Sequence, residues 1–194
     1  MKIVIEHLEA EMFPWCICEY SRVLADLKDR VLFTRVPLQD SSAHFATALG
    51  NNQFTDKSIA EVCADRSRVC LLDEQASLEL SPEDCSDFDY CLVGGILGNV
   101  DELDADRTKE LRTLGFPTRH LGTQQMTADT AAVVADMIVN QGKRLEEISF
   151  VDRPEFPIGP NESLILPFRL LKGPEGEAVI AEGIVDILIG EDGF

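Results

Sequence analysis

Short apolar runs alternate with segments of helical periodicity from the start of the chain to about residue 140. A strand that is apolar on both faces must be covered on both sides, which is typical of parallel sheets flanked by helices. The sequence therefore predicts an α/β fold, with a mostly parallel sheet and helices on both faces. The predicted strands cover residues 2–6, 31–36, 69–72, 90–93, 118–121 and 148–151.

Helical segments separate these strands, and several carry start or stop signals. Ser58 and Glu61 have the spacing of a capping box, so a short helix is expected up to about residue 64. Gly115 closes a helix predicted over residues 104–114, and Thr127 caps one that runs to about residue 140. The helix after the first strand places one set of side chains on a single face: Ile17, Tyr20, Val23, Leu24 and Leu27.

The chain is long enough for one core. With 194 residues, 45% of them apolar, it would be short for two. We predict a single compact domain over residues 1–152, with a C-terminal extension, residues 153–194, packed on it. Within the extension, residues 164–171 and 178–180 are predicted to form a β-hairpin joined through Gly173-Pro174-Glu175-Gly176. Prolines interrupt the regular pattern there: Pro154, Pro157, Pro160, Pro167 and Pro174.

The charge balance favours a basic partner. The chain carries 35 acidic and 17 basic residues, a net charge of −18, which repels phosphate backbones and attracts cationic groups. The same acidity also serves solubility alone. Charge therefore disfavours nucleic acid without naming a partner.

The sequence predicts a soluble protein of the cytoplasm. No long apolar stretch follows Lys2, and no later run approaches membrane length. The six cysteines form no Cys-x-x-Cys pair, so reduced, mostly buried thiols are expected. Cys16 and Cys18, taken with His7 or His44, match no usual zinc spacing, and no metal site is predicted.

Three predicted strand ends are candidates for a ligand site, because ligands of open parallel sheets bind beyond the carboxyl ends of the strands. These ends are Leu71-Leu72-Asp73, Gly94-Gly95-Ile96-Leu97-Gly98 and the segment from Leu121-Gly122 to Thr127. Glycines remove side chains that would keep a flat ring from the backbone. The spacing departs from the dinucleotide fingerprint, which disfavours a nicotinamide or flavin oxidoreductase.

The same segments resemble consecutive blocks of the SPOUT, or trefoil-knot, methyltransferase superfamily. Within it, the chain resembles the fungal protein-arginine methyltransferases that act on a small-subunit ribosomal protein. The likeness extends over nearly the whole chain and is weakest over residues 39–57 and after residue 184. The blocks that carry it are Tyr90-Cys91-Leu92-Val93-Gly94-Gly95-Ile96-Leu97-Gly98, Asp106-Arg107-Thr108-Lys109-Glu110-Leu111 and Arg119-His120-Leu121-Gly122-Thr123-Gln124-Gln125-Met126-Thr127-Ala128-Asp129-Thr130.

The resemblance implies a C-terminal trefoil knot and a cofactor, S-adenosylmethionine, that lies bent between the three strand ends and leaves as S-adenosylhomocysteine. Arg107 is implied to pair with the carboxylate of the cofactor, although a surface charge paired with nearby acids fits it equally well. The residues implied to line the cofactor are Leu71, Leu72, Gly94, Gly95, Ile96, Gly98, Arg107, Leu121, Gly122, Met126 and Thr127.

An arginine acceptor requires carboxylates. Its guanidinium has a pKa of roughly 13.8 and reacts poorly until a carboxylate orients it. Glu6 and Asp129 are the catalytic candidates, and Asp73 and Glu155 are candidates for gripping the substrate. Glu6 also fits a rim charge, and Asp129 fits a helix N-terminal charge that favours the dipole.

Two further functions remain open on the sequence alone. An RNA methyltransferase of the same fold would need a basic face, for which there are five candidates; a non-catalytic acidic binding module would bind no cofactor. The basic candidates are Lys109, Arg112, Arg119, Lys143 and Arg144.

A monomer is expected, because the C-terminal extension resembles that of monomeric relatives.

Overall fold

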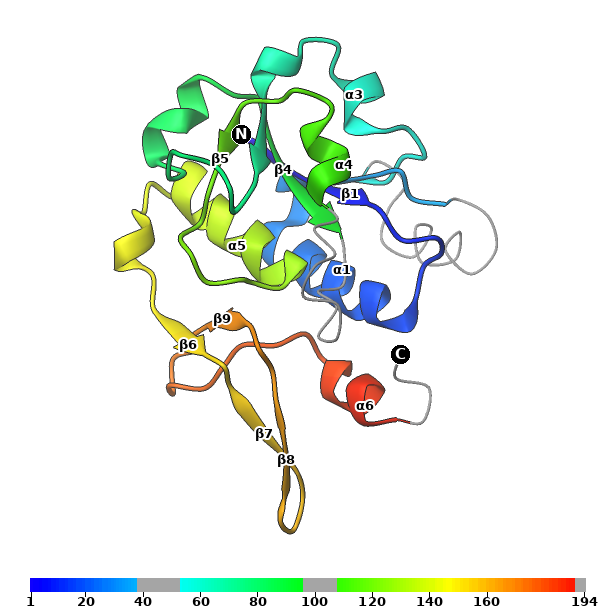
Figure 1. Cartoon of the computed structure of the whole chain (residues 1–194), viewed down its shortest axis with the longest axis vertical. Coiled ribbons are helices and arrows are strands. Elements are labelled where there is room, and N and C mark those ends of the chain that lie inside the picture. Colours follow the sequence, from blue (N-terminus) through cyan, green and yellow to red (C-terminus); the bar gives the residue numbers. More distant parts are fainter. Residues whose placement is uncertain (38–52, 96–107, 191–194) are drawn as a thin grey trace.

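A five-stranded parallel sheet forms the centre of the protein. The computed structural model describes residues 1–37, 53–95 and 108–190 (Figure 1). The strand order is β2-β1-β4-β3-β5, and every neighbouring pair is parallel. The strands are β1 (Lys2–His7), β2 (Val31–Thr34), β3 (Val69–Leu72), β4 (Tyr90–Gly95) and β5 (Thr118–Arg119). This confirms the predicted parallel sheet, although β2 and β5 end before the predicted residues, β2 at a point where Arg35 adopts a φ of 54°. The strand predicted over residues 148–151 lies outside this sheet, as β6 (Phe150–Asp152).

Helices cover both faces of the sheet, and the alternation of β1 shows how. Ile3 and Ile5 are fully buried in the larger core cluster, against side chains of α1 (Pro14–Leu27) and α5 (Ala128–Val139). Val4 is buried in a second cluster that contains Ile59 and Leu111. Those two residues belong to α3 (Ile59–Val62) and α4 (Thr108–Arg112), which therefore cover the opposite face.

The helix signals read from the sequence are confirmed where the structure describes them. Ser58 and Glu61 form the capping box of α3, and Thr127 is the N-cap of α5. Gly115, after α4, has a φ of 73°, in the left-handed region that favours glycine. Shorter 3-10 helices cover Lys28–Arg30, Arg66–Arg68, Pro82–Ser86 and Leu145–Glu147.

The C-terminal extension differs from the predicted hairpin. β7 (Glu155–Gly159) pairs with β8 (Glu162–Ile165) as an antiparallel hairpin, and β9 (Arg169–Leu171) pairs instead with β6 (Phe150–Asp152). At the predicted turn, residues 173–176, the chain does reverse, with an antiparallel bridge between Lys172 and Ala178 and hydrogen bonds from the Gly173 N–H to the Glu177 carbonyl and from the Val179 N–H to the Leu171 carbonyl. A hairpin is thus present in the extension, but over other residues than predicted, because Pro167 divides what reads as one long strand.

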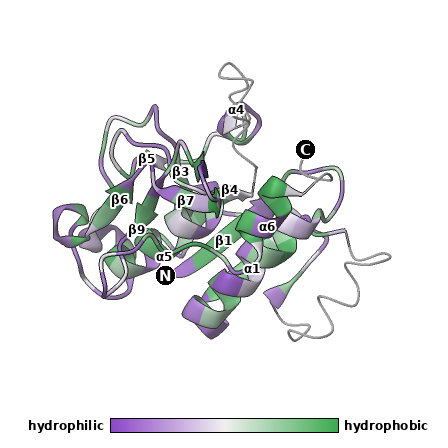
Figure 2. Cartoon of the chain, turned by 90° about the horizontal axis from the view of Figure 1, so that it is seen from below, coloured by the Kyte–Doolittle hydropathy of each residue, from purple (hydrophilic) through white to green (hydrophobic). Residues whose placement is uncertain are grey.

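The end of the extension packs on the main core. Ala181 and Ile184 are buried in the larger cluster, and α6 (Ile184–Ile189) contacts α1. Figure 2 shows hydrophobic residues along β1 and β4 and α6 beside α1. The division at residue 152 stays a prediction. So does the trefoil knot, because residues 96–107, between β4 and α4, lie outside the described ranges.

No helix among the described residues is both long and apolar enough to cross a membrane.

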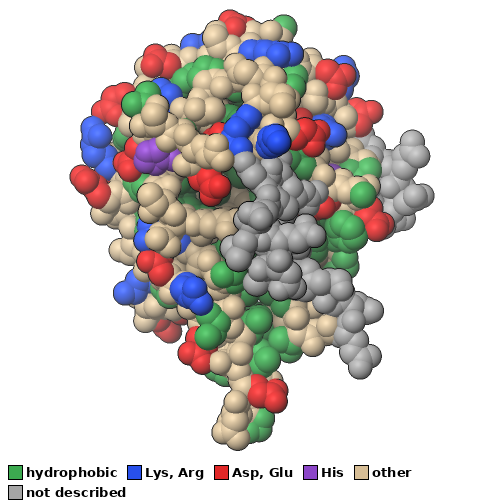
Figure 3. All heavy atoms as spheres, viewed as in Figure 1, with side chains coloured by type: hydrophobic (Ala, Val, Ile, Leu, Met, Phe, Trp, Pro, Cys, Tyr) green, Lys and Arg blue, Asp and Glu red, His purple; other side chains and the backbone are tan. Residues whose placement is uncertain are grey.

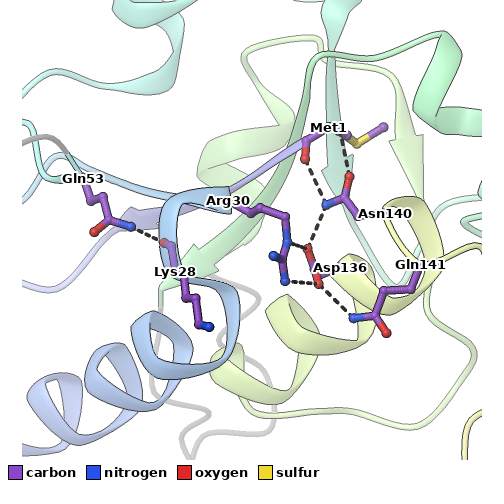
Figure 4. A network of polar contacts seen from close by, with 7 residues as sticks. All are labelled: Met1, Lys28, Arg30, Gln53, Asp136, Asn140 and Gln141. Atoms are coloured by element: carbon purple, nitrogen blue, oxygen red, sulfur yellow. Dashed lines mark hydrogen bonds and ion pairs between the residues drawn. The ribbon is translucent and has the colours of Figure 1, made fainter.

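A buried carboxylate joins the N-terminus, the turn after α1 and the end of α5. Arg30 donates to both oxygens of Asp136, over 2.7 and 3.0 Å, and Asn140 and Gln141 donate to the same carboxylate (Figure 4). Asn140 also accepts a hydrogen bond from the Met1 amino group over 2.9 Å. Burial alone would raise the pKa of Asp136, but the hydrogen bonds that it accepts outweigh burial and lower it.

Replacing Asp136 with alanine should lower the free energy of unfolding by about 3 kcal/mol at neutral pH, because it removes charge-assisted hydrogen bonds from a buried site. A lowered pKa means that this contribution is present above about pH 4 and is lost as the pH falls further. Urea denaturation at pH 7 and at pH 3 measures both effects. The matched control is Asp89→Ala, whose ion pair with Arg68 is exposed to water, so its loss should change the stability much less. Equal losses for the two variants would contradict this account.

Candidate functional site

The carboxyl ends of β4, β3 and β5 lie at one edge of the sheet, because the three strands are neighbours in parallel register. Leu72, Leu121 and Met126 are partly exposed there, and all three pack against the larger core cluster. Partly exposed apolar side chains beside free backbone groups suit a flat ring. Leu71 differs, because its side chain is fully buried in the second cluster and only its backbone can contribute.

Three predicted cofactor residues, Ile96, Gly98 and Arg107, lie outside the described residues. The described part of the predicted site therefore consists of the end of β4, the end of β3 and the loop that leads into α5.

Gly95 is required by the packing of the protein itself. A Cβ built on this residue would lie 2.6 Å from the Tyr20 hydroxyl oxygen, 2.9 Å from Cγ2 of Ile5 and 3.0 Å from the Glu6 carbonyl oxygen. Packing within the protein is thus a sufficient reason for this glycine, and room for a ligand at its backbone stays a prediction. Its backbone remains at the end of β4, where the Gly95 carbonyl accepts from the Leu8 N–H.

The tyrosine that contacts Gly95 is paired with His7. Nδ1 of His7 lies 2.9 Å from the Tyr20 hydroxyl, and both side chains are buried. Burial lowers the pKa of His7 and raises that of Tyr20, so a neutral imidazole and a neutral hydroxyl share this hydrogen bond. His7 is also the register partner of Gly95 in the sheet. The pair therefore fixes the strand end that carries the predicted site. The sequence offered a signal for this pair, because Tyr20 places a hydroxyl on an otherwise apolar helix face. A buried Tyr hydroxyl needs a hydrogen-bond partner.

The 121–127 loop is held at both ends. Gly122 has a φ of 84°, which side chains rarely adopt, and its N–H donates to His120 Nδ1 over 3.0 Å. Farther along, the Gln125 carbonyl accepts from the Arg169 N–H over 2.8 Å, and Met126 forms a parallel bridge with the same arginine. The C-terminal extension thus braces the loop, a contact that sequence reasoning missed because the two segments are far apart along the chain.

Asp129, a catalytic candidate, lies in a buried ionic cluster between α1 and α5. Its Oδ2 is 2.6 Å from Arg22 Nη1, and its Oδ1 accepts from the Thr130 N–H. Glu19 is buried beside them, and its pKa is raised well above the usual range by burial and by the charge of Asp129, against the opposing charge of Arg22. Glu19 Oε2 and Arg22 Nη2 make no hydrogen bond with the described residues.

Glu19 and Arg22 were not predicted as parts of the site, although helical spacing offered a signal. Glu19 lies four residues after Trp15 and four before Val23, and both of those residues are buried on α1. A carboxylate at that spacing falls on the buried face, where it must be paired or neutral.

Glu6, the other catalytic candidate, faces the opposite side of the sheet. It is 1% exposed, and its Oε2 accepts from the Thr34 hydroxyl over 2.8 Å and from the Ile59 N–H over 2.7 Å. Burial raises its pKa, although these hydrogen bonds oppose the rise. The structure therefore does not bring Glu6 and Asp129 together, and the carboxylate of Glu6 holds the start of α3.

The two candidates for gripping a substrate have different surroundings. Asp73 is buried, pairs with Arg112 and accepts from the Gln75 N–H; the hydrogen bond from Arg112 lowers its pKa. Its carboxylate is thus engaged in holding α4 against the end of β3. Glu155, in contrast, is exposed on β7, where it accepts a hydrogen bond from the Ser163 hydroxyl.

The mostly parallel sheet with helices on both faces is that of the SPOUT class of methyltransferase folds, as the similarity to solved structures at 35% identity shows. The crystal structure of Trm10 from Thermococcus kodakaraensis is similar in fold alone, with a TM-score of 0.53 at 16% identity over 76% of this chain and 96% of that chain.

Closer relatives define the family. Residues 2–192 match the model of the family "Protein arginine N-methyltransferase SFM1-like". The chain is 36% identical to protein arginine N-methyltransferase SFM1 of Saccharomyces cerevisiae, over 97% of this chain and 94% of that protein. The crystal structure of yeast SFM1 complexed with SAH is similar with a TM-score of 0.85, at 35% identity over 96% of this chain and 94% of that one. The crystal structure of yeast SFM1 complexed with SAM has a TM-score of 0.84, at 36% identity over 96% of this chain and 89% of that one. The chain belongs to the SFM1-like protein arginine N-methyltransferases, which confirms the resemblance read from the sequence.

Proposed function

We propose that this protein transfers a methyl group from S-adenosylmethionine to an arginine of a basic protein of the small ribosomal subunit, acting as a monomer in the cytoplasm. The observation that carries the proposal is the family match over residues 2–192. Solved yeast relatives of similar length contain SAM or SAH.

The residues present fit such a donor. Leu72, Leu121 and Met126 offer partly exposed apolar surface to an adenine ring, and the backbone of Gly94 and Gly122 lies at the same strand edge. When bound, S-adenosylmethionine supplies an electrophilic methyl group on a sulfonium centre. The protein contributes by holding the strand ends in place, since alignment of the two reactants lowers the barrier.

The charge of the chain suits an arginine acceptor. A net charge of −18 raises the local concentration of a basic protein and stabilises its cationic guanidinium near the site. Asp129 remains the described carboxylate closest in sequence to the 121–127 loop. Because Oδ2 of Asp129 is already paired with Arg22, this carboxylate would not contact the acceptor through that oxygen. It would act on the acceptor through the electrostatic field of the Glu19–Arg22–Asp129 cluster.

An RNA acceptor is less favoured, because three of the five basic candidates are neutralised. Arg112 pairs with Asp73, Arg119 with Asp84 and Arg144 with Glu83. An arginine that is paired with a carboxylate contributes little net positive charge toward a phosphate. The basic face that this alternative requires is therefore not assembled from these residues.

Two features support the cellular setting and the monomer. All six cysteines are free thiols, although Cys70 and Cys91 are register partners on adjacent strands, which suits a reducing compartment. Helix α6 packs on α1, so that part of the surface of α1 is covered within the chain itself.

Purified protein with methyl-labelled S-adenosylmethionine should label RNA-free protein from small ribosomal subunits, and peptide mapping should place the label on arginine. Deproteinised RNA from the same subunits is the paired sample, and a reaction without enzyme is the control. Label in RNA alone would contradict the proposed acceptor. Absence of donor binding by calorimetry would instead favour a non-catalytic binding module.

A further inference from the structure

The first turn of the 121–127 loop is closed by a side chain. The Gly122 N–H donates to Nδ1 of His120 over 3.0 Å, and this hydrogen bond spans Leu121. Because a backbone N–H can only donate, Nδ1 must accept, so the imidazole is neutral here and carries its proton on Nε2. Leu121 is one of the partly exposed apolar residues of the predicted donor site. The hydrogen bond therefore holds a residue that is expected to contact the donor.

The backbone of His120 is itself held in place. Its N–H donates to the Leu78 carbonyl over 2.9 Å, and its carbonyl accepts from the Leu80 N–H over 3.0 Å. Leu80 is 1% exposed and belongs to the larger core cluster. Gly122, two residues farther along, has a φ of 84°. The imidazole thus joins a residue fixed at the end of β5 to a left-handed turn, and the hydrogen bond constrains the position of Leu121 between them.

Protonation of His120 would remove the hydrogen bond. An imidazolium ring donates from both nitrogens, so its Nδ1–H would face the Gly122 N–H instead of accepting from it. Imidazoles take up this proton between about pH 8 and pH 5. His120 is partly exposed, so water can supply the proton. Acidification therefore releases the first turn of the loop, whereas the brace from Arg169 at the other end is unaffected, because it is a bond between backbone groups.

The charged groups around His120 must be separated from its own titration. Glu79 forms a parallel bridge with His120, and its side chain is exposed. Figure 3 shows acidic and basic side chains interspersed around the histidine atoms that reach the surface. Other charged residues on the surrounding segments are already engaged: Arg119 with Asp84, Arg144 with Glu83, and Glu147 with the Arg144 N–H.

We propose that His120 is a positioning residue for the methyl donor, because its neutral imidazole holds Leu121 and Gly122 in the form that binds S-adenosylmethionine. Protonation of the imidazole releases that form, so donor binding weakens as the pH falls. His120 acts through the backbone of Gly122 and needs no contact of its own with the donor. This inference rests on the proposed function and adds a residue outside the predicted donor contacts, together with a pH dependence of donor binding.

Three variants test the proposal. His120→Asn keeps an acceptor, because an asparagine side chain can accept from the N–H two residues on, and it does not titrate. His120→Phe keeps a ring but has no acceptor. Glu79→Gln is the control, since it removes the neighbouring titratable carboxylate and leaves the hydrogen bond from Gly122 in place. Calorimetry with S-adenosylmethionine at pH 7.5 and pH 5.5 gives the donor affinity. NMR of the donor-free protein follows the Gly122 amide and the His120 ring as the pH changes.

Between pH 7.5 and pH 5.5, the parent and Glu79→Gln should each lose about fivefold in donor affinity beyond any loss in His120→Asn, which is the effect of one hydrogen bond. His120→Phe should bind the donor about fivefold more weakly than the parent at pH 7.5. In the donor-free parent, the Gly122 amide should shift with the same pH midpoint as the His120 ring. In His120→Asn it should not shift.

Equal losses of affinity in the parent and in His120→Asn would overturn the positioning role, and so would a Gly122 amide that does not follow the His120 ring. A loss that disappears in Glu79→Gln would also overturn it, because the pH dependence would then belong to that carboxylate. Absence of donor binding by the parent at both pH values would instead remove the proposed function, while the NMR titration would still show whether the hydrogen bond exists. The two failures are therefore distinguishable.

Discussion

Replacing Gly95 with alanine should destabilise the protein by about 2–3 kcal/mol, the cost of adding a methyl group to a well-packed interior. The new Cβ would overlap the Tyr20 hydroxyl, and two of its three nearest neighbours are on β1, which cannot move without disturbing the sheet. Because strain at this strand end also displaces the predicted site, donor affinity should fall at least tenfold, which corresponds to about 1.4 kcal/mol. Thermal denaturation and calorimetry with S-adenosylmethionine measure the two effects.

Two companion variants make this expectation specific. Gly115→Ala places a side chain at a φ of 73° with no atom within 4 Å, so only backbone strain of about 1 kcal/mol is expected, with normal donor affinity. Tyr20→Phe combined with Gly95→Ala removes the closest overlapping atom and should recover part of the stability. If the double variant is as unstable as the sum of the two single variants, the contact with the Tyr20 hydroxyl is not the cause.

Replacing Asp129 with alanine should cost about 3–5 kcal/mol, because the Arg22 guanidinium would remain buried without its counterion. The side chains of the pair are 9% and 3% exposed, so water cannot readily take the place of the carboxylate. Replacing both partners, Arg22→Met with Asp129→Leu, should cost much less than the single change. Urea denaturation gives the stabilities. Turnover of the folded double variant then tests catalysis, since normal turnover would reject a role for Asp129 in the reaction.

Glu19 supplies the pH dependence of the same cluster. Its pKa is raised, so in the folded protein it keeps a proton that the unfolded chain releases above about pH 4.3. The unfolded state therefore binds fewer protons, and the free energy of unfolding falls as the pH rises through the interval between the two pKa values. Glu19→Gln, which is neutral at every pH, should remove this fall and make the protein more stable than the parent at pH 8. A parent and variant with parallel stability curves from pH 4 to pH 8 would contradict the assignment.

The sheet could be predicted because its strands are buried on both faces and read as apolar runs. β1, β3 and β4 have starts that match the predicted ones, since burial on both faces leaves little freedom in where such runs begin. The hairpin could not be predicted in the same way. β8 and β9 are separated by Pro167 and choose different partners, β7 and β6, and pairing between strands is not encoded in the composition of either strand.

The donor site stays a prediction, but the place of its described residues in the fold can be compared with the sequence analysis. The carboxyl ends of parallel strands lie at one edge of the sheet, so the sequence could place Leu72, Leu121 and Met126 at that edge. The sequence could not show which helix covers which face. It therefore offered both Glu6 and Asp129 as catalytic candidates, whereas Glu6 bonds to Ile59 and Asp129 to Arg22, on opposite sides of the sheet.

The hydrogen bond from Arg169 to Gln125 also has a consequence for how the protein matures. During synthesis the 121–127 loop leaves the ribosome well before the segment that braces it, and folding of a nascent chain proceeds from its N-terminal end. A chain still attached to the ribosome therefore lacks the brace until β9 has emerged. The 121–127 loop therefore reaches its final form only after β9, made later in synthesis, has folded beside it.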